Sequence, residues 1–252
     1  MEISGKKAVI VGGASGMAKA SAEQLKAKGA SVAILDLPTS AGAEVAKELG
    51  GTFHELDVLD TDGTEQALQD AVEALGGLHI AVNTAGGGIG KRTLTKEGPH
   101  PLDEFRRVID LNLIASFNLN RLQANYMSQN EPEDDERGVI INTASIAAFE
   151  GQIGQVAYAA AKAGIVGMTF TMARDLGSLG IRVTAIAPSL FSTGITQGIP
   201  DEFATMLTKD AAFPKRMGRP EEYGRLAVAI VENPMLNAGT IRLDGGQRFA
   251  PK

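Results

Sequence analysis

The sequence predicts one α/β domain in which a parallel sheet carries helices on both faces. Three observations lead to it: a length of 252 residues, strand and helix patterns that alternate strictly, and strands that read as continuous apolar runs. A chain of this length is routinely accommodated by one α/β domain. Continuous apolar strands are typical of parallel strands covered on both faces, and alternating elements imply right-handed crossovers.

The elements follow one another along the whole chain. Strands are expected at KKAVIVG (6–12), SVAILD (31–36), TFHELDV (52–58), LHIAVNTA (78–85), GVIINTAS (138–145), IRVTAIAP (181–188) and TIRLD (240–244). Helices are expected near 16–28, 40–48, 62–75, 101–127, 155–177 and 220–232. Residues 1–252 therefore form a single domain with a Rossmann-like, doubly wound sheet of about seven parallel strands.

Composition excludes several classes of function. The net charge is −6, so neither nucleic acid nor an anionic membrane is an expected partner, because both need a basic face. Cysteine is absent and the three histidines lie in separate segments, so no catalytic metal is expected. No apolar run approaches the length of a membrane span, and the first strand begins too early for a signal peptide. A cytoplasmic location is expected.

The first turn, GGASGMA (12–18), has the properties of a phosphate site. It departs from the common GxGxxG spacing, but its glycines lie between a buried strand and a helix N-terminus. Bare backbone there approaches phosphate closely, and free N–H groups meet its charge. Gly12 shapes the turn and Gly16 opens the helix. An ordinary strand-to-helix turn is the alternative.

The second strand ends in Asp36, about 20 positions past the glycines, where an acidic residue hydrogen-bonds the adenosine ribose diol. This carboxylate repels a 2′-phosphate, and Leu37 and Pro38 follow it where an NADP enzyme carries Arg or Lys. NAD is therefore the expected cofactor. Asp57, at the end of the third strand, is a candidate for the adenine edge; the alternative is a helix N-cap.

A second glycine cluster, NTAGGGIGK (83–91), is not a P-loop. Ala85 occupies the position of a required glycine, and Arg92 replaces the required Ser or Thr. Gly86 instead lets the backbone pass close to a flat cofactor.

The segment YAAAK places Tyr158 and Lys162 four residues apart on one helix face. Oxidising an alcohol without zinc needs a side chain to take the hydroxyl proton, and a free tyrosine, with a pKa near 10, is too weak an acid. One positive charge at about 4 Å, with an effective dielectric of ~20, contributes roughly 4 kcal/mol and lowers the pKa by about 3. Lys162 is thus expected to acidify Tyr158, and oxidised nicotinamide adds a second positive charge.

Ser145 ends the fifth strand, at the carboxyl edge of the sheet where open α/β folds bind ligands. Its hydroxyl is placed to hydrogen-bond a substrate oxygen. A turn residue is the alternative.

GGASGMA, Asp36, the NTAG run, Asn112 in DLNL, Ser145 and YAAAK together resemble the short-chain dehydrogenase/reductase family, in order and over essentially the whole chain. The resemblance implies catalytic roles for Asn112, Ser145, Tyr158 and Lys162, with Asn112 holding a water in a proton relay; a polar kink in a packed helix is its alternative. Departures from the family pattern occur around the cofactor and in one turn, at Val11, Ala18, Thr84 and Ser189.

GVIINTASIAAFEGQIGQVAYAAAKAGIVGMT, NEPEDDERG and ENPMLNAGTIRLDGG resemble a branch of this family, the type-2 3-hydroxyacyl-CoA dehydrogenases. The branch implies an NAD-dependent homotetramer acting in fatty acid metabolism on short or branched 3-hydroxyacyl-CoA. It implies the following cofactor-binding residues: Gly12, Ser15, Gly16, Met17, Asp36, Asp57, Val58, Asn83, Thr84, Ala85, Gly86, Tyr158, Lys162, Pro188, Phe191 and Thr193.

Segment 188–214 carries apolar residues suited to an acyl chain or a sterol, and after the sixth strand it is expected to form a substrate loop. A packed surface helix is the alternative. Lys91, Arg92 and Lys96 are candidates for CoA phosphates or for solvated loop charges. Two other functions remain open: a hydroxysteroid or other short-chain alcohol dehydrogenase, and an RNA-associated or scaffold subunit.

Overall fold

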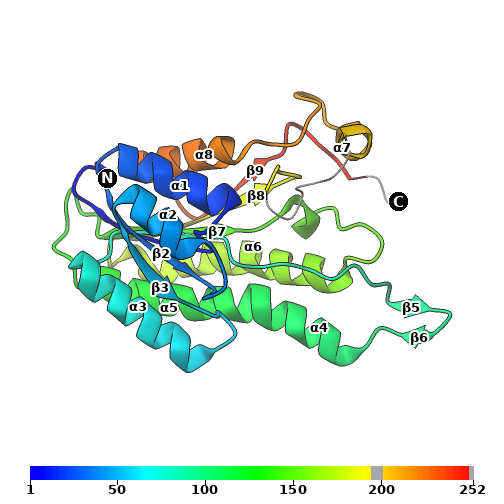
Figure 1. The fold of residues 1–252 in the computed structure, drawn as a ribbon, viewed down its shortest axis with the longest axis horizontal. Coiled ribbons are helices and arrows are strands. Elements are labelled where there is room, and N and C mark those ends of the chain that lie inside the picture. Colours follow the sequence, from blue (N-terminus) through cyan, green and yellow to red (C-terminus); the bar gives the residue numbers. More distant parts are fainter. Residues whose placement is uncertain (194–200, 250–252) are drawn as a thin grey trace.

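The computed structural model describes residues 1–193 and 201–249. Its centre is a seven-stranded sheet with the strand order β3-β2-β1-β4-β7-β8-β9 (Figure 1). Every neighbouring pair in this sheet runs parallel. The strands are β1 (Lys7–Val11), β2 (Ser31–Asp36), β3 (Thr52–Glu55), β4 (Ile80–Asn83), β7 (Gly138–Thr143), β8 (Ile181–Pro188) and β9 (Thr240–Leu243). The predicted doubly wound sheet is confirmed.

Helices cover both faces of this sheet. Figure 1 shows α1, α2 and α8 above it and α3, α5 and α6 below it. The helices are α1 (Gly16–Ala27), α2 (Gly42–Leu49), α3 (Thr61–Leu75), α4 (Leu102–Ile109), α5 (Ala115–Met127), α6 (Val156–Gly177), α7 (Asp201–Thr208) and α8 (Pro220–Glu232).

Successive residues of each strand enter opposite layers of the core, because side chains alternate across a sheet. In β1, Ala8 and Ile10 pack in the cluster that contains α1 and α8. Val9 and Val11 pack in the cluster that contains α3 and α5. Both clusters are apolar, so the strand is a continuous apolar run.

Three local features differ from the predicted elements. The helix expected over 101–127 is divided into α4 and α5 by a π-helical turn, Asp110–Ile114, which contains Asn112. A short hairpin, β5 (Leu94–Thr95) and β6 (Gly98–Pro99), stands out from the sheet (Figure 1). A 3₁₀ turn, Ile146–Ala148, follows Ser145. π-Helical turns inside helices are frequent at functional sites, which draws attention to Asn112.

Helix α6 corrects the expectation that no apolar run approaches the length of a membrane span. Among the described residues it is the one helix long and apolar enough to cross a membrane, with a mean hydropathy of 1.3 over the apolar stretch. The same length and composition suit a core helix. Here Ala161, Ile165 and Met172 are buried against the sheet and its neighbouring helices.

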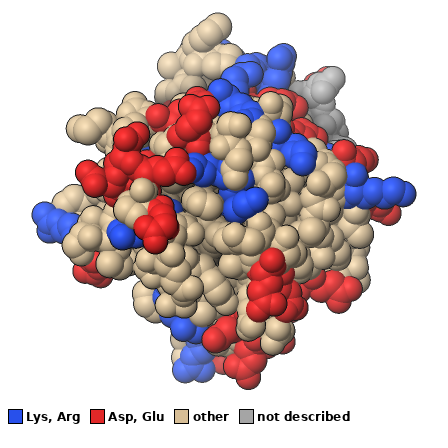
Figure 2. All heavy atoms as spheres, turned by 90° about the vertical axis from the view of Figure 1, so that its left-hand side faces the viewer, with Lys and Arg blue, Asp and Glu red and all other residues tan. Residues whose placement is uncertain are grey.

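Figure 2 shows the face at the left of Figure 1. Lys and Arg side chains are interspersed there with Asp and Glu, without a continuous basic area. Two buried ion pairs join the Met1 ammonium group and Arg182 to Glu136, at 3.0 and 2.7 Å. The expectation against a nucleic-acid partner stays a prediction.

The strand order reverses at β1, whose neighbours are β2 and β4. Connections leave these strands toward opposite faces of the sheet, which opens a crevice beyond their carboxyl ends. Ligands of open α/β sheets bind in such crevices. The predicted site residues are therefore to be sought at this edge.

Candidate active site

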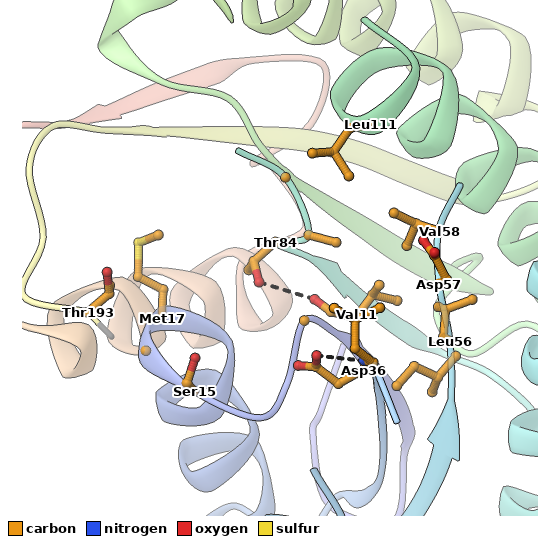
Figure 3. Close-up of a pocket in the computed structure, with 16 residues that line it drawn as sticks. Val11, Ser15, Met17, Asp36, Leu56, Asp57, Val58, Thr84, Leu111 and Thr193 are labelled. Carbon is orange, nitrogen blue, oxygen red and sulfur yellow. Dashed lines mark hydrogen bonds between the residues drawn. The ribbon is translucent and has the colours of Figure 1, made fainter. Parts of the chain in front are cut away.

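A cavity of about 370 Å³ lies beyond the carboxyl ends of β1, β2, β3 and β4 (Figure 3). This volume is within the range of small-molecule sites. Eleven of the predicted cofactor residues line it: Gly12, Ser15, Gly16, Met17, Asp36, Asp57, Val58, Thr84, Ala85, Gly86 and Thr193. The sequence pattern did not single out the apolar walls, which Leu35, Leu37, Leu56 and Leu111 contribute.

The glycine turn at this cavity leaves no room for a side chain at Gly12. Gly12 has φ +78°, and a Cβ on it would come within 2.7 Å of Thr84 Oγ1. The Thr84 hydroxyl in turn donates to the Val11 carbonyl at 3.1 Å, which ties the ends of β4 and β1 together. Gly16 begins helix α1, and Ser15 at its N-cap makes no side-chain capping bond. This cradle of bare backbone at a helix N-terminus fits a pyrophosphate.

Asp36 is held in place by the glycine turn and by the residue that follows it. Its Oδ2 accepts from the Ala14 N–H at 2.9 Å and its Oδ1 accepts from the Leu37 N–H at 2.8 Å. Each carboxylate oxygen keeps a second lone pair for a ligand. The carboxylate faces the cavity in Figure 3.

Asp57 also lines the cavity, with Oδ1 accepting from the Leu59 N–H at 3.0 Å. The alternative role considered for it was the N-cap of the next helix. That role belongs to Asp60, whose side chain accepts from the Gly63 N–H of α3.

A second cavity, of about 350 Å³, adjoins the first. Predicted residues that line it include Ser145, Tyr158, Lys162, Pro188 and Phe191. Four residues line both cavities, namely Met17, Thr84, Gly86 and Thr193, so the two form one continuous crevice.

Tyr158 and Lys162 lie on the same side of α6, as the four-residue spacing predicts. The Lys162 ammonium nitrogen is 5.6 Å from the centre of the Tyr158 ring. It is 3% exposed and donates to the Thr143 carbonyl at 2.8 Å.

The electrostatic balance of this pair differs from the expectation. Burial lowers the pKa of Lys162 to about 8. Burial also raises the pKa of Tyr158, and a hydrogen bond with Ser145 offsets part of that rise. In the protein without cofactor, burial therefore outweighs the acidifying effect that was expected from Lys162, and the contribution expected from oxidised nicotinamide stays a prediction. Desolvation penalises both charged forms, and a shared helix face does not reveal it.

Ser145 is 9% exposed and begins the 3₁₀ turn after β7. Its Oγ accepts from the Ala147 N–H at 3.1 Å, which fixes the side chain at the carboxyl edge. Its single hydroxyl proton is the one that the hydrogen bond with Tyr158 uses in the protein without substrate.

Asn112 lies directly behind the glycine loop rather than in either cavity. Its Nδ2 donates to the Gly87 carbonyl at 2.6 Å and its Oδ1 accepts from the Gly87 N–H at 3.1 Å. A Cβ on Gly86 would come within 2.5 Å of that oxygen and 3.3 Å of Lys162 Nζ. The Asn112 side chain therefore fixes the glycine loop between the two cavities.

Asn83 requires a correction. Of the predicted cofactor residues it is the one that lines neither cavity. Its side chain points into a buried amide cluster with Asn120, Gln123 and Asn142. Asn83 ends a strand whose next residue turns to the cavity, so alternation sends its side chain to the opposite face.

Residues of the predicted substrate segment are only partly described. Phe191 is 5% exposed and bridges to Gly218, on which a Cβ would lie 2.5 Å from the phenyl ring. The segment includes α7, whereas residues 194–200 lie outside the described part of the chain. Gln155, which sequence reasoning missed, lines the second cavity.

Of the three cationic residues considered for CoA phosphates, Lys91 has a protein partner. Its ammonium group contacts both carboxylate oxygens of Glu104, at 2.8 and 3.0 Å. Arg92 lines a separate cavity of about 420 Å³ beside residues 151–156.

The sequence and the structure were compared with those of known proteins. Residues 6–203 match the family described as short chain dehydrogenase. The chain belongs to this family. A human protein named 3-hydroxyacyl-CoA dehydrogenase type-2 is 49% identical over 99% of this chain and 97% of its own. The Drosophila melanogaster protein of that name is 48% identical, over 96% and 97%.

A solved structure has the same fold. The crystal structure of 3-hydroxyacyl-CoA dehydrogenase type-2 from Mycobacterium avium matches with a TM-score of 0.94 and 42% identity, covering 98% of each chain. This short-chain dehydrogenase is therefore an oxidoreductase.

Proposed function

We propose that this short-chain dehydrogenase interconverts a 3-hydroxyacyl-CoA and a 3-oxoacyl-CoA of short or branched chain, with NAD as the hydride carrier. The observation that carries the proposal is one crevice in which a phenol, an ammonium group and a serine hydroxyl adjoin a cavity with the features of a dinucleotide site.

The first cavity suits NAD in three respects. The glycine turn offers bare backbone to a pyrophosphate, Asp36 offers carboxylate oxygens to a ribose diol, and apolar side chains line the remaining wall. When bound, NAD accepts or returns the hydride and, in its oxidised form, adds a positive charge near the phenol.

The residues of the second cavity carry the proton. Ser145 Oγ–H donates to the substrate oxygen and stabilises charge that develops on it. Tyr158, as phenolate, takes the hydroxyl proton during oxidation, and as phenol returns it during reduction. Lys162, held by the Thr143 carbonyl, keeps a positive charge near the phenolate when its amine is protonated.

The substrate class rests on the relatives and on the cavity wall. The curated relatives described above are named for 3-hydroxyacyl-CoA. Leu190, Phe191 and Ile89 give the second cavity an apolar lining suited to a short acyl chain. A steroid or another secondary alcohol is the alternative substrate for the same chemistry.

A substrate panel tests the function. With NAD⁺, the purified protein is expected to form NADH from 3-hydroxybutyryl-CoA and 3-hydroxy-2-methylbutyryl-CoA faster than from a hydroxysteroid. Turnover of the steroid alone would change the substrate assignment. Absence of turnover with every alcohol, in protein that still binds NADH, would refute the function.

Replacing Asp36 by Ala is expected to raise the KM for NAD⁺ by about 10–100-fold, because hydrogen bonds to a charged group contribute roughly 1.5–3 kcal/mol. The same change is expected to lower the KM for NADP⁺, since it removes the charge that repels a 2′-phosphate. Asp60→Ala, which removes a carboxylate that caps α3 and lines neither cavity, is the matched control. An unchanged NAD⁺/NADP⁺ preference would show that Asp36 does not hydrogen-bond the adenosine ribose.

We also propose that the protein associates with further copies of itself through α4, α5 and α6. Apolar side chains on this side are about half exposed: Leu102, Ile114, Phe117, Val156 and Phe170. Burying them in a homotetramer would remove an unusual amount of apolar surface from water. Light scattering tests this, and a monomer at micromolar concentration would contradict it.

A further inference from the structure

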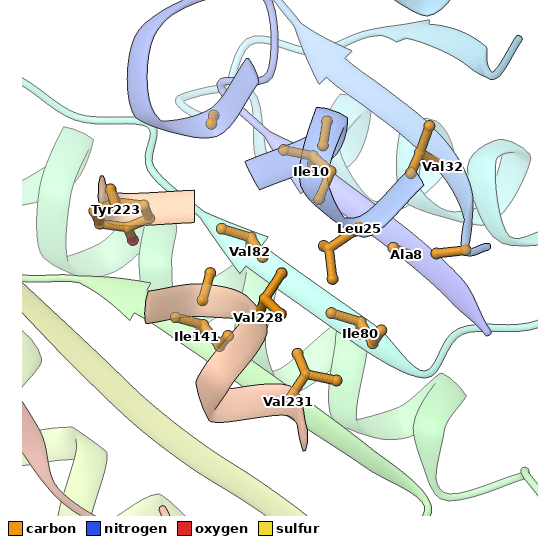
Figure 4. Packing of buried hydrophobic residues seen from close by; sticks show 14 of the residues in the cluster. Ala8, Ile10, Leu25, Val32, Ile80, Val82, Ile141, Tyr223, Val228 and Val231 are labelled. Atoms are coloured by element: carbon orange, nitrogen blue, oxygen red, sulfur yellow. The ribbon is translucent and has the colours of Figure 1, made fainter. Parts of the chain in front are cut away.

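One fully buried phenol lies outside the two cavities. Tyr223, from helix α8, is fully buried in the apolar cluster between α8, α1 and the sheet, as its labelled ring in Figure 4 shows. The Tyr223 hydroxyl oxygen, the one polar atom of this side chain, is hydrogen-bonded to the Thr143 hydroxyl at the end of β7, at 2.7 Å. A polar group placed in such surroundings costs free energy unless it is paired, so this contact calls for an explanation.

Proton counting fixes the direction of the contact. Thr143 Oγ1 donates its single proton to the Asn83 carbonyl, at 2.7 Å. The hydroxyl pair therefore has Tyr223 as donor and Thr143 as acceptor. Burial raises the pKa of Tyr223, which keeps its proton in place. The result is a directed chain from α8 through the end of β7 to the end of β4.

The same threonine carries the acceptor of the catalytic ammonium group. Lys162 Nζ donates to the Thr143 main-chain carbonyl at 2.8 Å, and this carbonyl is its hydrogen-bond acceptor among the described residues. Thr143 also lines the active-site cavity. Side-chain bonds to Tyr223 and Asn83 fix the threonine on two sides, and so fix the carbonyl that orients Lys162.

We propose that Tyr223 and Thr143 are positioning residues for Lys162, acting through the Thr143 carbonyl. The proposal rests on the proposed function. Without the pair, the carbonyl no longer holds the ammonium group in a fixed place, and its support for the Tyr158 phenolate weakens. Tyr158 and Lys162 are the titratable side chains among the described residues that line this cavity, so a pH profile of turnover reports on them.

Three variants test the pair in the full-length protein: Tyr223→Phe, Thr143→Val and Thr143→Ser. The first two remove one hydroxyl each and keep the size of the side chain, while serine keeps the hydroxyl. Loss of one hydrogen bond is expected to move the acid limb of the kcat profile up by about 0.5–1 pH unit. It is expected to lower kcat at neutral pH by roughly 3–10-fold. Thr143→Ser, which keeps the hydroxyl, should show the same pH profile as the wild-type protein.

A second readout needs neither cofactor nor turnover. NMR of protein labelled with ¹⁵N-lysine, with the Lys162 signal assigned by Lys162→Met, measures the pKa of Lys162 directly. The proposal expects it to fall in Tyr223→Phe and Thr143→Val and to stay in Thr143→Ser. Tyr126→Phe, which removes the hydroxyl of half-buried Tyr126 on α5, is the matched control. It should change neither the pH profile nor the pKa of Lys162.

The outcomes separate the two proposals. If Tyr223→Phe and Thr143→Val melt at a lower temperature but keep the Lys162 pKa and the pH profile, the pair is only structural and the inference is overturned. If no variant and no wild-type protein oxidises a 3-hydroxyacyl-CoA, the proposed function fails. The lysine titration still decides the positioning role in that case.

Discussion

Tyr158→Phe is expected to lower kcat by about 10²–10⁴-fold, the usual contribution of a positioned acid–base group. Phenylalanine keeps the ring against Gly88, on which a Cβ would lie 2.8 Å from Tyr158 Cδ2, so the loop between the cavities keeps its support. The fold and the affinity for NADH should therefore be unchanged, because only the proton carrier is lost. Steady-state kinetics together with NADH fluorescence titration measure the two quantities.

The control for this variant is Tyr126→Phe, since Tyr126 lies on α5 and lines neither cavity. It should turn over like the wild-type protein. If the Tyr158→Phe enzyme keeps more than about one hundredth of wild-type kcat, the phenol does not carry the proton, because a loss below about 10²-fold is too small for that role.

Lys162→Met is expected to abolish turnover and at the same time to stabilise the protein without cofactor. Burial lowers the pKa of Lys162 from 10.5 to about 8, so the folded protein holds an ammonium group that prefers water. That difference corresponds to a penalty on the order of 3 kcal/mol, and the lost bond to the Thr143 carbonyl offsets about 1 kcal/mol of the gain. A net gain of about 2 kcal/mol in the free energy of unfolding is expected at neutral pH.

The pH dependence of this gain has a definite sign. Below about pH 8 the lysine is protonated in both the folded and the unfolded protein, and the penalty is fully present. Between about 8 and 10.5 the unfolded protein binds more protons, so wild-type stability rises with pH relative to the variant. Urea unfolding of both proteins at pH 7 and near pH 10 should show the difference shrinking. A variant less stable than wild type at pH 7 would contradict the assigned burial penalty.

The sequence alone predicted a sheet of about seven parallel strands with helices on both faces, because continuous apolar strands that alternate with helices imply it. The order of the strands came from the structure. Each apolar run became a parallel strand, and each glycine or acidic residue expected at a strand end stands at the carboxyl edge. Tyr158 and Lys162 face one cavity since the helical repeat places them on one side.

Features that depend on burial or on distant contacts were not predictable from sequence. The direction of the Tyr158 pKa depends on the surrounding core, which residue spacing does not describe. The Asn83 side chain bonds to Asn120, Gln123 and Asn142, which lie far along the chain, whereas its neighbour Thr84 lines the cavity. The partner of Thr143 is Tyr223, 80 residues along the chain, and no local pattern connects them.

Short irregular elements were missed for a related reason. The hairpin of β5 and β6 has two residues in each strand, which is too few for a periodic pattern. The π-helical turn at Asn112 interrupts a helix whose apolar pattern continues on both sides of it.

The central claim is that the cavity beside Asp36 and the cavity beside Tyr158 form one site through which a hydride passes. Isotope transfer tests it most directly, using 3-hydroxybutyryl-CoA that carries deuterium on the carbon bearing the hydroxyl. The account predicts that NADH formed by the wild-type protein contains this deuterium at the nicotinamide ring. Unlabelled NADH, or deuterium released into water, would contradict it.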